Sequence, residues 1–168
     1  MTTTGEPRWL TTEERTSWLA LIGLMARLWP ALDSQLRRDA GVTFFEYTVL
    51  VVLSEAPGRT LRMSSLARLA EGSLSRLSQA VARLEAKGWV RRTPDPEDGR
   101  YTLAILTEDG VDKVVASAPG HVAEVRRLVF DPLTKAQARQ LAAIGSRIMT
   151  AIDPDEPDLP FASGRYPS

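Results

Sequence analysis

The chain has 168 residues, of which 43% are hydrophobic and 25% charged, and its formal net charge is zero. These values are typical of a globular protein of about one domain, and the complete absence of cysteine excludes disulfides and thiol-based redox or metal switches. No apolar run approaches the ~20 residues that cross a bilayer, and residues 1–12 lack a hydrophobic leader segment, so a cytoplasmic location is expected.

Residues 1–12 are expected to form a disordered N-terminus, and a long helix is expected to follow over residues 13–40. Thr11 and Glu14 form a capping box at its start, and Pro30 should kink the helix. The apolar stripe of this helix consists of Trp18, Leu21, Ile22, Met25, Leu28, Trp29, Leu32 and Leu36.

A second capping box, Thr43 with Glu46, opens another helix, and Pro57-Gly58 ends it. The helix is expected to lie mostly in the core because apolar residues dominate it. These residues are Tyr47, Val49, Leu50, Val52 and Leu53.

Two helices joined by a short turn are expected between Ser64 and Gly88. Ser64 can cap the first helix, Glu71-Gly72 breaks it, and Ser73 caps the second. The second helix ends at Lys87-Gly88, a cation followed by a glycine at the usual stop position. The spacing is that of a helix-turn-helix.

The second helix of this pair has an apolar face and a polar face. The expected buried face consists of Leu74, Leu77, Ala80, Val81 and Leu84. At about 100° per residue, Ser75, Gln79 and Ala82 point the opposite way, with Arg76 and Arg83 on one flank and Ser78 on the other. Arg can pair with guanine and Gln with adenine, so Arg76 and Gln79 are the best candidate base readers. The alternative is that these are ordinary solvated side chains.

A β-hairpin should follow, with strands at Trp89–Thr93 and Tyr101–Leu106. Pro94 should stop the first strand, Asp98-Gly99 favours the turn, and the second strand alternates at period two. Between Arg62 and Arg100 there are eight Arg or Lys against five acids, a local basic excess in a neutral chain. The alternative for Asp95–Arg100 is a solvated loop that contacts nothing.

The C-terminal part should supply two more helices, giving about six in all. Thr107 caps a helix over 108–129 that is expected to be interrupted at Pro119-Gly120, and Thr134 with Gln137 forms a third capping box. The last helix carries Leu141, Ile144, Ile148, Met149 and Ile152. These apolar stripes could close the monomer core, pair two subunits, or do both. Residues 153–168 are expected to be an acidic, proline-rich flexible tail.

Several of these motifs occur together in one known family. Ser73-Leu74-Ser75-Arg76-Leu77, Asp95-Pro96-Glu97-Asp98-Gly99-Arg100 and Leu106-Thr107-Glu108-Asp109-Gly110 resemble the MarR (multiple-antibiotic-resistance regulator) family of bacterial transcription regulators. The resemblance covers roughly residues 12 to 152, and the wing pattern D-x-x-D-x-R followed by L-T-x-x-G is its most specific part. Glu71-Gly72 departs from the family, which more often has Gly followed by an apolar residue there. That departure could alter how tightly the two helices pack.

The resemblance implies a mostly α fold with a small β-hairpin wing. It implies one domain over residues 13–152, with a winged helix-turn-helix at 43–107 and dimerisation helices at 13–40 and 108–152. It also implies that the helix from Ser73 lies in a major groove, and that Arg100 enters a minor groove, oriented by a salt bridge from Asp98. The candidate DNA-binding residues are Ser73, Ser75, Arg76, Ser78, Gln79, Arg83, Asp98 and Arg100.

The function expected from the resemblance is a homodimeric repressor of palindromic operators. A small, often aromatic or phenolic effector would bind between the dimerisation helices and the winged helix and relieve repression. Candidate pocket residues are Trp18, Trp29, Phe44, Tyr47 and His121, although each is more often plain core.

The residue types and motifs that metal sites, cofactor sites and enzymes usually need are missing from this sequence. His121 is the sole histidine and there is no cysteine, so we expect no metal site and no cofactor. The chain has no nucleophile elbow, phosphate-binding loop, dinucleotide fingerprint or zinc-protease motif, so we expect no enzymatic activity. The alternative function is a winged-helix ligand- or protein-binding module without operator binding.

Overall fold

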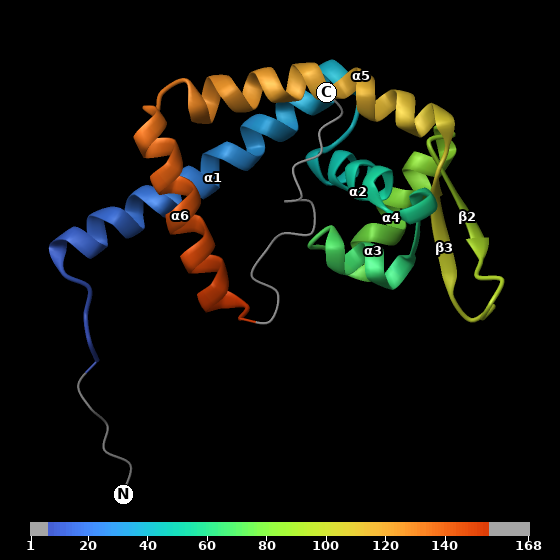
Figure 1. The fold of residues 1–168 in the computed structure, drawn as a ribbon, viewed down its shortest axis with the longest axis horizontal. Helices are drawn as coiled ribbons and strands as arrows, with labels where there is room; N and C mark the ends of the chain where they lie inside the picture. Colours follow the sequence, from blue (N-terminus) through green and yellow to red (C-terminus); the bar gives the residue numbers. More distant parts are fainter. Residues whose placement is uncertain (1–6, 155–168) are drawn as a thin grey trace, which may run out of the picture.

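The structure is a computed structural model that describes residues 7–154, and within them it contains six α-helices and a three-stranded sheet (Figure 1). The mostly α class and the small β wing are therefore confirmed. The elements in chain order are α1 (Thr12–Ala40), α2 (Phe44–Glu55), a 3-10 turn (Pro57–Arg59), β1 (Thr60–Arg62), α3 (Met63–Leu69), α4 (Leu74–Ala86), β2 (Val90–Pro94), β3 (Thr102–Leu106), α5 (Glu108–Val125), a π-helical turn (Arg126–Phe130) and α6 (Lys135–Ile152).

Three capping boxes begin helices where the sequence places them. The hydroxyls of Thr11, Thr43 and Thr134 each accept a hydrogen bond from the backbone N–H three residues on. The side chain at that position in turn accepts a hydrogen bond from the threonine N–H. These bonds satisfy backbone donors that have no partner inside the helix. The starts of α1, α2 and α6 are thereby confirmed.

The core lies between α2, α3, α4 and the sheet. Its fully buried side chains come from each of these elements, and α5 closes it through Val114. Gly72 allows a close approach here, because a Cβ at this position would lie 2.6 Å from Cζ of the buried Phe45 ring. The preceding Glu71 adopts a left-handed φ of 52°. The Glu71-Gly72 turn therefore packs tightly against α2.

The sheet is antiparallel with the strand order β1-β3-β2. The sequence did not predict β1, whose three residues are too few for a period-two pattern. The expectation that Pro94 stops β2 and that Tyr101 opens β3 was wrong by one residue at each point, since Pro94 pairs with Thr102. A proline fits here because β2 is an edge strand, so the backbone nitrogen that lacks a hydrogen can face solvent and no hydrogen bond of the sheet is lost.

The expected cap of α3 and the expected buried face of α4 also need correction. Ser64 does not cap α3, because β1 runs straight into the helix and Arg62 takes the cap position without a side-chain bond. In α4, Leu77, Ala80, Val81 and Leu84 are buried, but Leu74 is 56% exposed. Leu74 is the first residue of the helix, and the buried face of α4 begins only one turn later, at Leu77.

The expected interruption of α5 at Pro119-Gly120 is wrong as well. The helix continues unbroken from Glu108 to Val125, with Pro119 in its interior. The adjacent residue His121 is buried and faces Gln35 of α1. Packing against α1 outweighs the local cost of proline. In the same way, Pro30 lies inside α1 without ending it.

Helices α1, α5 and α6 extend away from the winged helix-turn-helix (Figure 1). In the view of Figure 1, α6 passes across the line of α1. It has no buried residue, although apolar side chains line one face of it. No helix between residues 7 and 154 combines the length and the apolar character needed to cross a membrane. Most of the expected flexible ends, residues 1–6 and 155–168, lie outside the described residues.

Candidate nucleic-acid interface

Helix α4 presents a polar face to solvent. The Ser73 hydroxyl accepts the N–H of Arg76 at 3.2 Å and caps the helix, as the sequence predicted. Ser75, Ser78 and Gln79 are all exposed. Because the opposite face is anchored in the core, these side chains have a fixed direction and are free to bind a ligand.

Arg76 lies on the flank of α4 that faces α2. The guanidinium carbon of Arg76 is 4.1 Å from the centroid of the Phe45 ring, a cation–π contact. The positive charge of Arg76 also helps to lower the pKa of Asp33 in α1. Burial would raise the pKa of Asp33, but hydrogen bonds from Arg37 and the Phe44 N–H, with the charges of Arg37 and Arg76, hold it below its ordinary value. Arg76 is therefore held near α2 at the start of α4.

Arg83 has an ionic partner inside the domain. Its Nε donates to Glu46 Oε1 at 2.6 Å, and the other oxygen of Glu46 accepts the Thr43 N–H. Burial would raise the pKa of Glu46, but the Thr43 N–H and the Arg83 guanidinium outweigh it and hold the pKa low. Arg83 thus joins α4 to the start of α2, which the sequence did not indicate.

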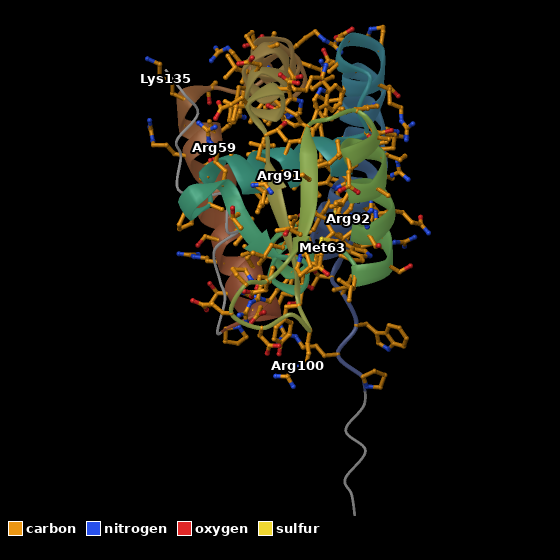
Figure 2. All side chains as sticks on the ribbon, turned by 90° about the vertical axis from the view of Figure 1, so that its right-hand side faces the viewer. Arg59, Met63, Arg91, Arg92, Arg100 and Lys135 are labelled. Atoms are coloured by element: carbon orange, nitrogen blue, oxygen red, sulfur yellow. The ribbon has the colours of Figure 1, made fainter. Side chains whose placement is uncertain are left out.

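The hairpin loop ends in an arginine held by an aspartate. Arg100 Nη2 donates to Asp98 Oδ2 at 2.7 Å and its Nε to Oδ1 at 2.9 Å, so the predicted ion pair is present. Hydrogen bonds from Arg100 hold the pKa of Asp98 below its ordinary value. The Arg100 side chain is still 84% exposed, and Figure 2 shows it at the tip of the hairpin, pointing away from the body.

A second group of residues fixes the base of this wing. Asp95 is buried, and it accepts hydrogen bonds from Arg62 Nε at 2.8 Å and from the Glu97 N–H at 3.0 Å. The guanidinium carbon of Arg62 lies 4.5 Å from the centroid of the Tyr101 ring. Sequence reasoning missed these contacts because it assigned no strand at β1. The Asp-Pro-Glu turn pattern was the available signal.

The Leu-Thr-x-x-Gly motif joins the wing to α5. The Thr107 hydroxyl donates to the Gly88 carbonyl at 2.7 Å and accepts the Gly110 N–H at 3.1 Å. A Cβ at Gly110 would overlap the carbonyl oxygen of Trp89 and lie 2.6 Å from Leu106 Cδ1. Glycine is thus required for α5 to begin directly against Trp89, which precedes β2, and Leu106, the last residue of β3.

Four of the five predicted pocket residues meet where α1, α2 and α5 join. The ring centroids of Trp29 and Phe44 are 5.0 Å apart, those of Phe44 and His121 6.0 Å, and those of Tyr47 and His121 5.0 Å. Burial lowers the pKa of His121. Trp18 lies on α1 about 16 Å from Trp29 along the helix axis, toward the N-terminus of the helix, and does not join this cluster.

The comparisons with known proteins agree with this geometry. A sequence model described as the MarR family matches residues 40–100, which run from the end of α1 to Arg100. The crystal structure of Sco3205, a MarR family transcriptional regulator from Streptomyces coelicolor in complex with DNA, is 48% identical. The match covers 94% of this chain and 98% of that chain, with a TM-score of 0.84. This chain belongs to the MarR family.

A second solved structure and a sequence relative support the assignment to the MarR family. AbsC, a MarR family transcriptional regulator from Streptomyces coelicolor, is 35% identical with a TM-score of 0.80, covering 89% of this chain and all of that one. The uncharacterized HTH-type transcriptional regulator YdcH of Bacillus subtilis (strain 168) is 31% identical over 100 residues, 55% of this chain and 68% of YdcH. As a MarR family member, the chain is a transcriptional regulator and not an enzyme.

Proposed function

We propose that this protein is a homodimeric repressor that binds pseudo-palindromic double-stranded DNA in the cytoplasm and is released by a small-molecule effector. The observation that carries the proposal is the exposed polar face of α4 next to a hairpin whose tip arginine is 84% exposed. A helix of this kind fits a major groove, and an exposed arginine fits the narrow, negative minor groove. Sco3205, to which this chain is 48% identical, was solved in complex with DNA, which supports DNA binding by this chain.

The proposed readers of sequence are Arg76 and Gln79. Both lie in the first two turns of α4, with Ser75 and Ser78 beside them to bind phosphates or bridging waters. Arg76 must leave Phe45, or extend past it, to reach a base edge. Arg83 is bound to Glu46, so its contribution would be to orient α4 and add positive charge.

Dimer formation would let one protein read two half-sites. A single recognition helix reads few base pairs, and two-fold pairing places two such helices about 34 to 36 Å apart on the duplex. The exposed apolar side chains of α1 and α6 support the proposal, as does an open groove of about 430 Å³ along α1, lined by Leu19, Ala20, Gly23, Leu24, Arg27, Leu28, Ala31 and Leu128.

The proposed effector is a small aromatic or phenolic compound bound near Trp29, Phe44, Tyr47 and His121. This cluster lies where the dimerisation helices meet the winged helix-turn-helix, so a ligand there could change their relative position. CouR from Rhodococcus jostii RHA1, which shares the fold at 22% identity with a TM-score of 0.66, was solved with p-coumaroyl-CoA bound. An aromatic acyl compound is therefore a reasonable first probe.

A duplex-binding assay with salt titration tests the DNA-binding part. The probe is a duplex selected by the protein from a random 30-base-pair pool. We expect specific binding with a steep salt dependence, because phosphate contacts release counterions. We expect Arg100→Ala to weaken binding by about 1 to 3 kcal/mol, and Arg76→Ala by a similar amount with relaxed specificity.

The matched control is Arg15→Ala, which removes the same charge from an exposed position at the start of α1. It should leave the affinity within about twofold of the wild type. Failure to bind any duplex at low salt would overturn the proposal in favour of a ligand- or protein-binding module. Unchanged affinity in both Arg100→Ala and Arg76→Ala would overturn the proposed docking.

A further inference from the structure

Leu74 is an exposed aliphatic side chain at the start of the recognition helix. Residues 41–107 are all described, and among them only Leu74 and Tyr101 are large hydrophobic side chains with high exposure. Tyr101 has a partner in the stacked Arg62, and the other exposed large hydrophobics lie on or before α1, or on α5, the π-helical turn and α6. Among residues 41–107, Leu74 is therefore the one exposed large hydrophobic side chain that such a contact does not explain, and it lies outside the proposed dimer surface.

The position of Leu74 on α4 places it beside the proposed base readers. At about 100° per residue, Leu74 and Ser78 share one flank, Ser75 and Gln79 occupy the outward centre, and Arg76 lies on the other flank. Arg76 is directed toward Phe45 of α2. The flank of Leu74 faces the opposite way.

The direction of that flank is set by an ion pair further along the helix. Glu85 follows Leu74 by about three turns and so lies on nearly the same side of α4. Its carboxylate accepts hydrogen bonds from Arg92 Nε at 2.9 Å and Nη2 at 2.6 Å, and from the Arg92 N–H at 2.9 Å. Arg92 is in β2, so Leu74 lies on the wing side of the recognition helix, at its N-terminal end.

We propose that Leu74 contacts the C5 methyl group of a thymine in each half-site and so determines specificity at that base pair. The inference rests on the proposed DNA binding and extends it to one base. A leucine can offer no hydrogen bond, and in the major groove the apolar group that distinguishes one base from the others is the thymine methyl. Serine, glutamine and arginine nearby would read polar edges instead.

Thymine-to-uracil substitution tests this contact directly, because it removes one methyl group and keeps every hydrogen-bonding group of the base. The selected duplex is resynthesised with deoxyuridine at one pair of symmetry-related thymines at a time. At one such pair we expect the wild-type affinity to fall by about fourfold for each methyl group removed. Leu74→Ala should bind the thymine and uracil duplexes equally at that pair.

Leu74→Met is the matched control, since it keeps an apolar side chain of similar size and should retain the sensitivity to uracil. Leu74→Ala should remain folded because the side chain is exposed. The inference is overturned if no substituted pair matters, if Leu74→Ala keeps the wild-type sensitivity, or if the selected half-sites contain no thymine. In each of these cases specific binding itself persists and the proposed function stands. Absence of any specific binding overturns both.

Discussion

His121 is held as a neutral imidazole by a chain of side-chain contacts. Gln35 Nε2 donates to Asp39 Oδ2 at 3.1 Å, which turns Gln35 Oε1 toward His121 Nδ1 at 3.3 Å. Because that oxygen can only accept, Nδ1 must carry the proton. The Tyr47 and Phe44 rings cover the imidazole, and burial lowers its pKa. The folded protein therefore resists taking up a second proton at this residue.

This arrangement predicts a loss of stability in mild acid. The pKa of His121 is lower in the folded than in the unfolded chain, so below about pH 6.5 the unfolded chain binds a proton that the folded chain does not. The free energy of unfolding should therefore fall as pH decreases from 7.5 to 5.5, by at most about 1.4 kcal/mol per pH unit. Urea denaturation at several pH values measures it.

The sole-histidine composition supplies the control for that experiment. His121→Gln has no titrating group at this site and should flatten the pH dependence between 7.5 and 5.5. The carboxylates of Asp33, Glu46 and Asp98, whose pKa values are lowered, titrate below this window. An equal slope in the wild type and in His121→Gln would show that the imidazole does not titrate as expected.

At the scale of elements, the junction between the wing and α5 depends on one glycine. Gly110 lies in the first turn of α5, where a Cβ would overlap the Trp89 carbonyl oxygen and press on Leu106. Backbone atoms at the end of a packed core cannot move aside as a flexible side chain can. The same helix connects the DNA-binding part to the proposed dimer surface, so this junction sets their relative position.

We expect Gly110→Ala to destabilise the fold by about 1 to 3 kcal/mol, as overpacking usually does. Thermal or urea denaturation measures the change. Gly120→Ala is the matched control in the same helix, because its Cβ would lie at an ordinary 3.5 Å from Gln35 Nε2. That variant should be neutral or slightly stabilising because alanine favours a helix over glycine. Equal effects of the two changes would contradict the steric account.

For the whole molecule, the exposed apolar face of α6 gives the strongest support for the proposed dimer. Ile144, Ile148 and Ile152 are 55%, 42% and 78% exposed on one face of this helix. A stable helix of this kind usually buries its apolar face against another element. A second copy of the chain fits, because each subunit then covers the stripe of the other.

We expect Ile148→Asp to weaken self-association by more than a hundredfold, since a carboxylate would be buried in an apolar interface. Sedimentation velocity should show a monomer where the wild type is a dimer, and affinity for the selected duplex should fall with it. Ser146→Asp places the same charge on the opposite, exposed face of α6 and should leave the dimer intact. A dimeric Ile148→Asp protein would exclude this helix face from the interface.

The sequence alone determined the features that depend on neighbours a few residues away. The three capping boxes, the Ser73 cap, the Asp98–Arg100 pair and the Thr107 cap each join residues two or three positions apart, and all are present. Such contacts need only neighbours in the sequence, so their residue pattern predicted them here, whereas the Ser64 cap, predicted in the same way, is absent because β1 runs straight into α3. The family resemblance rested on other local motifs, including Asp95–Arg100 and Leu106–Gly110, and the Asp98–Arg100 pair was one of its implications.

Only the tertiary structure decided the features that join distant parts of the chain. Arg62 binds Asp95 across 33 positions and Arg83 binds Glu46 across 37, so neither pair leaves a local pattern. The exposure of Leu74 depends on where the core ends, and the continuity of α5 through Pro119 depends on packing against α1. Long-range packing overrides local propensity at such positions, because burial and pairing with distant residues contribute more free energy than the local preference of one residue.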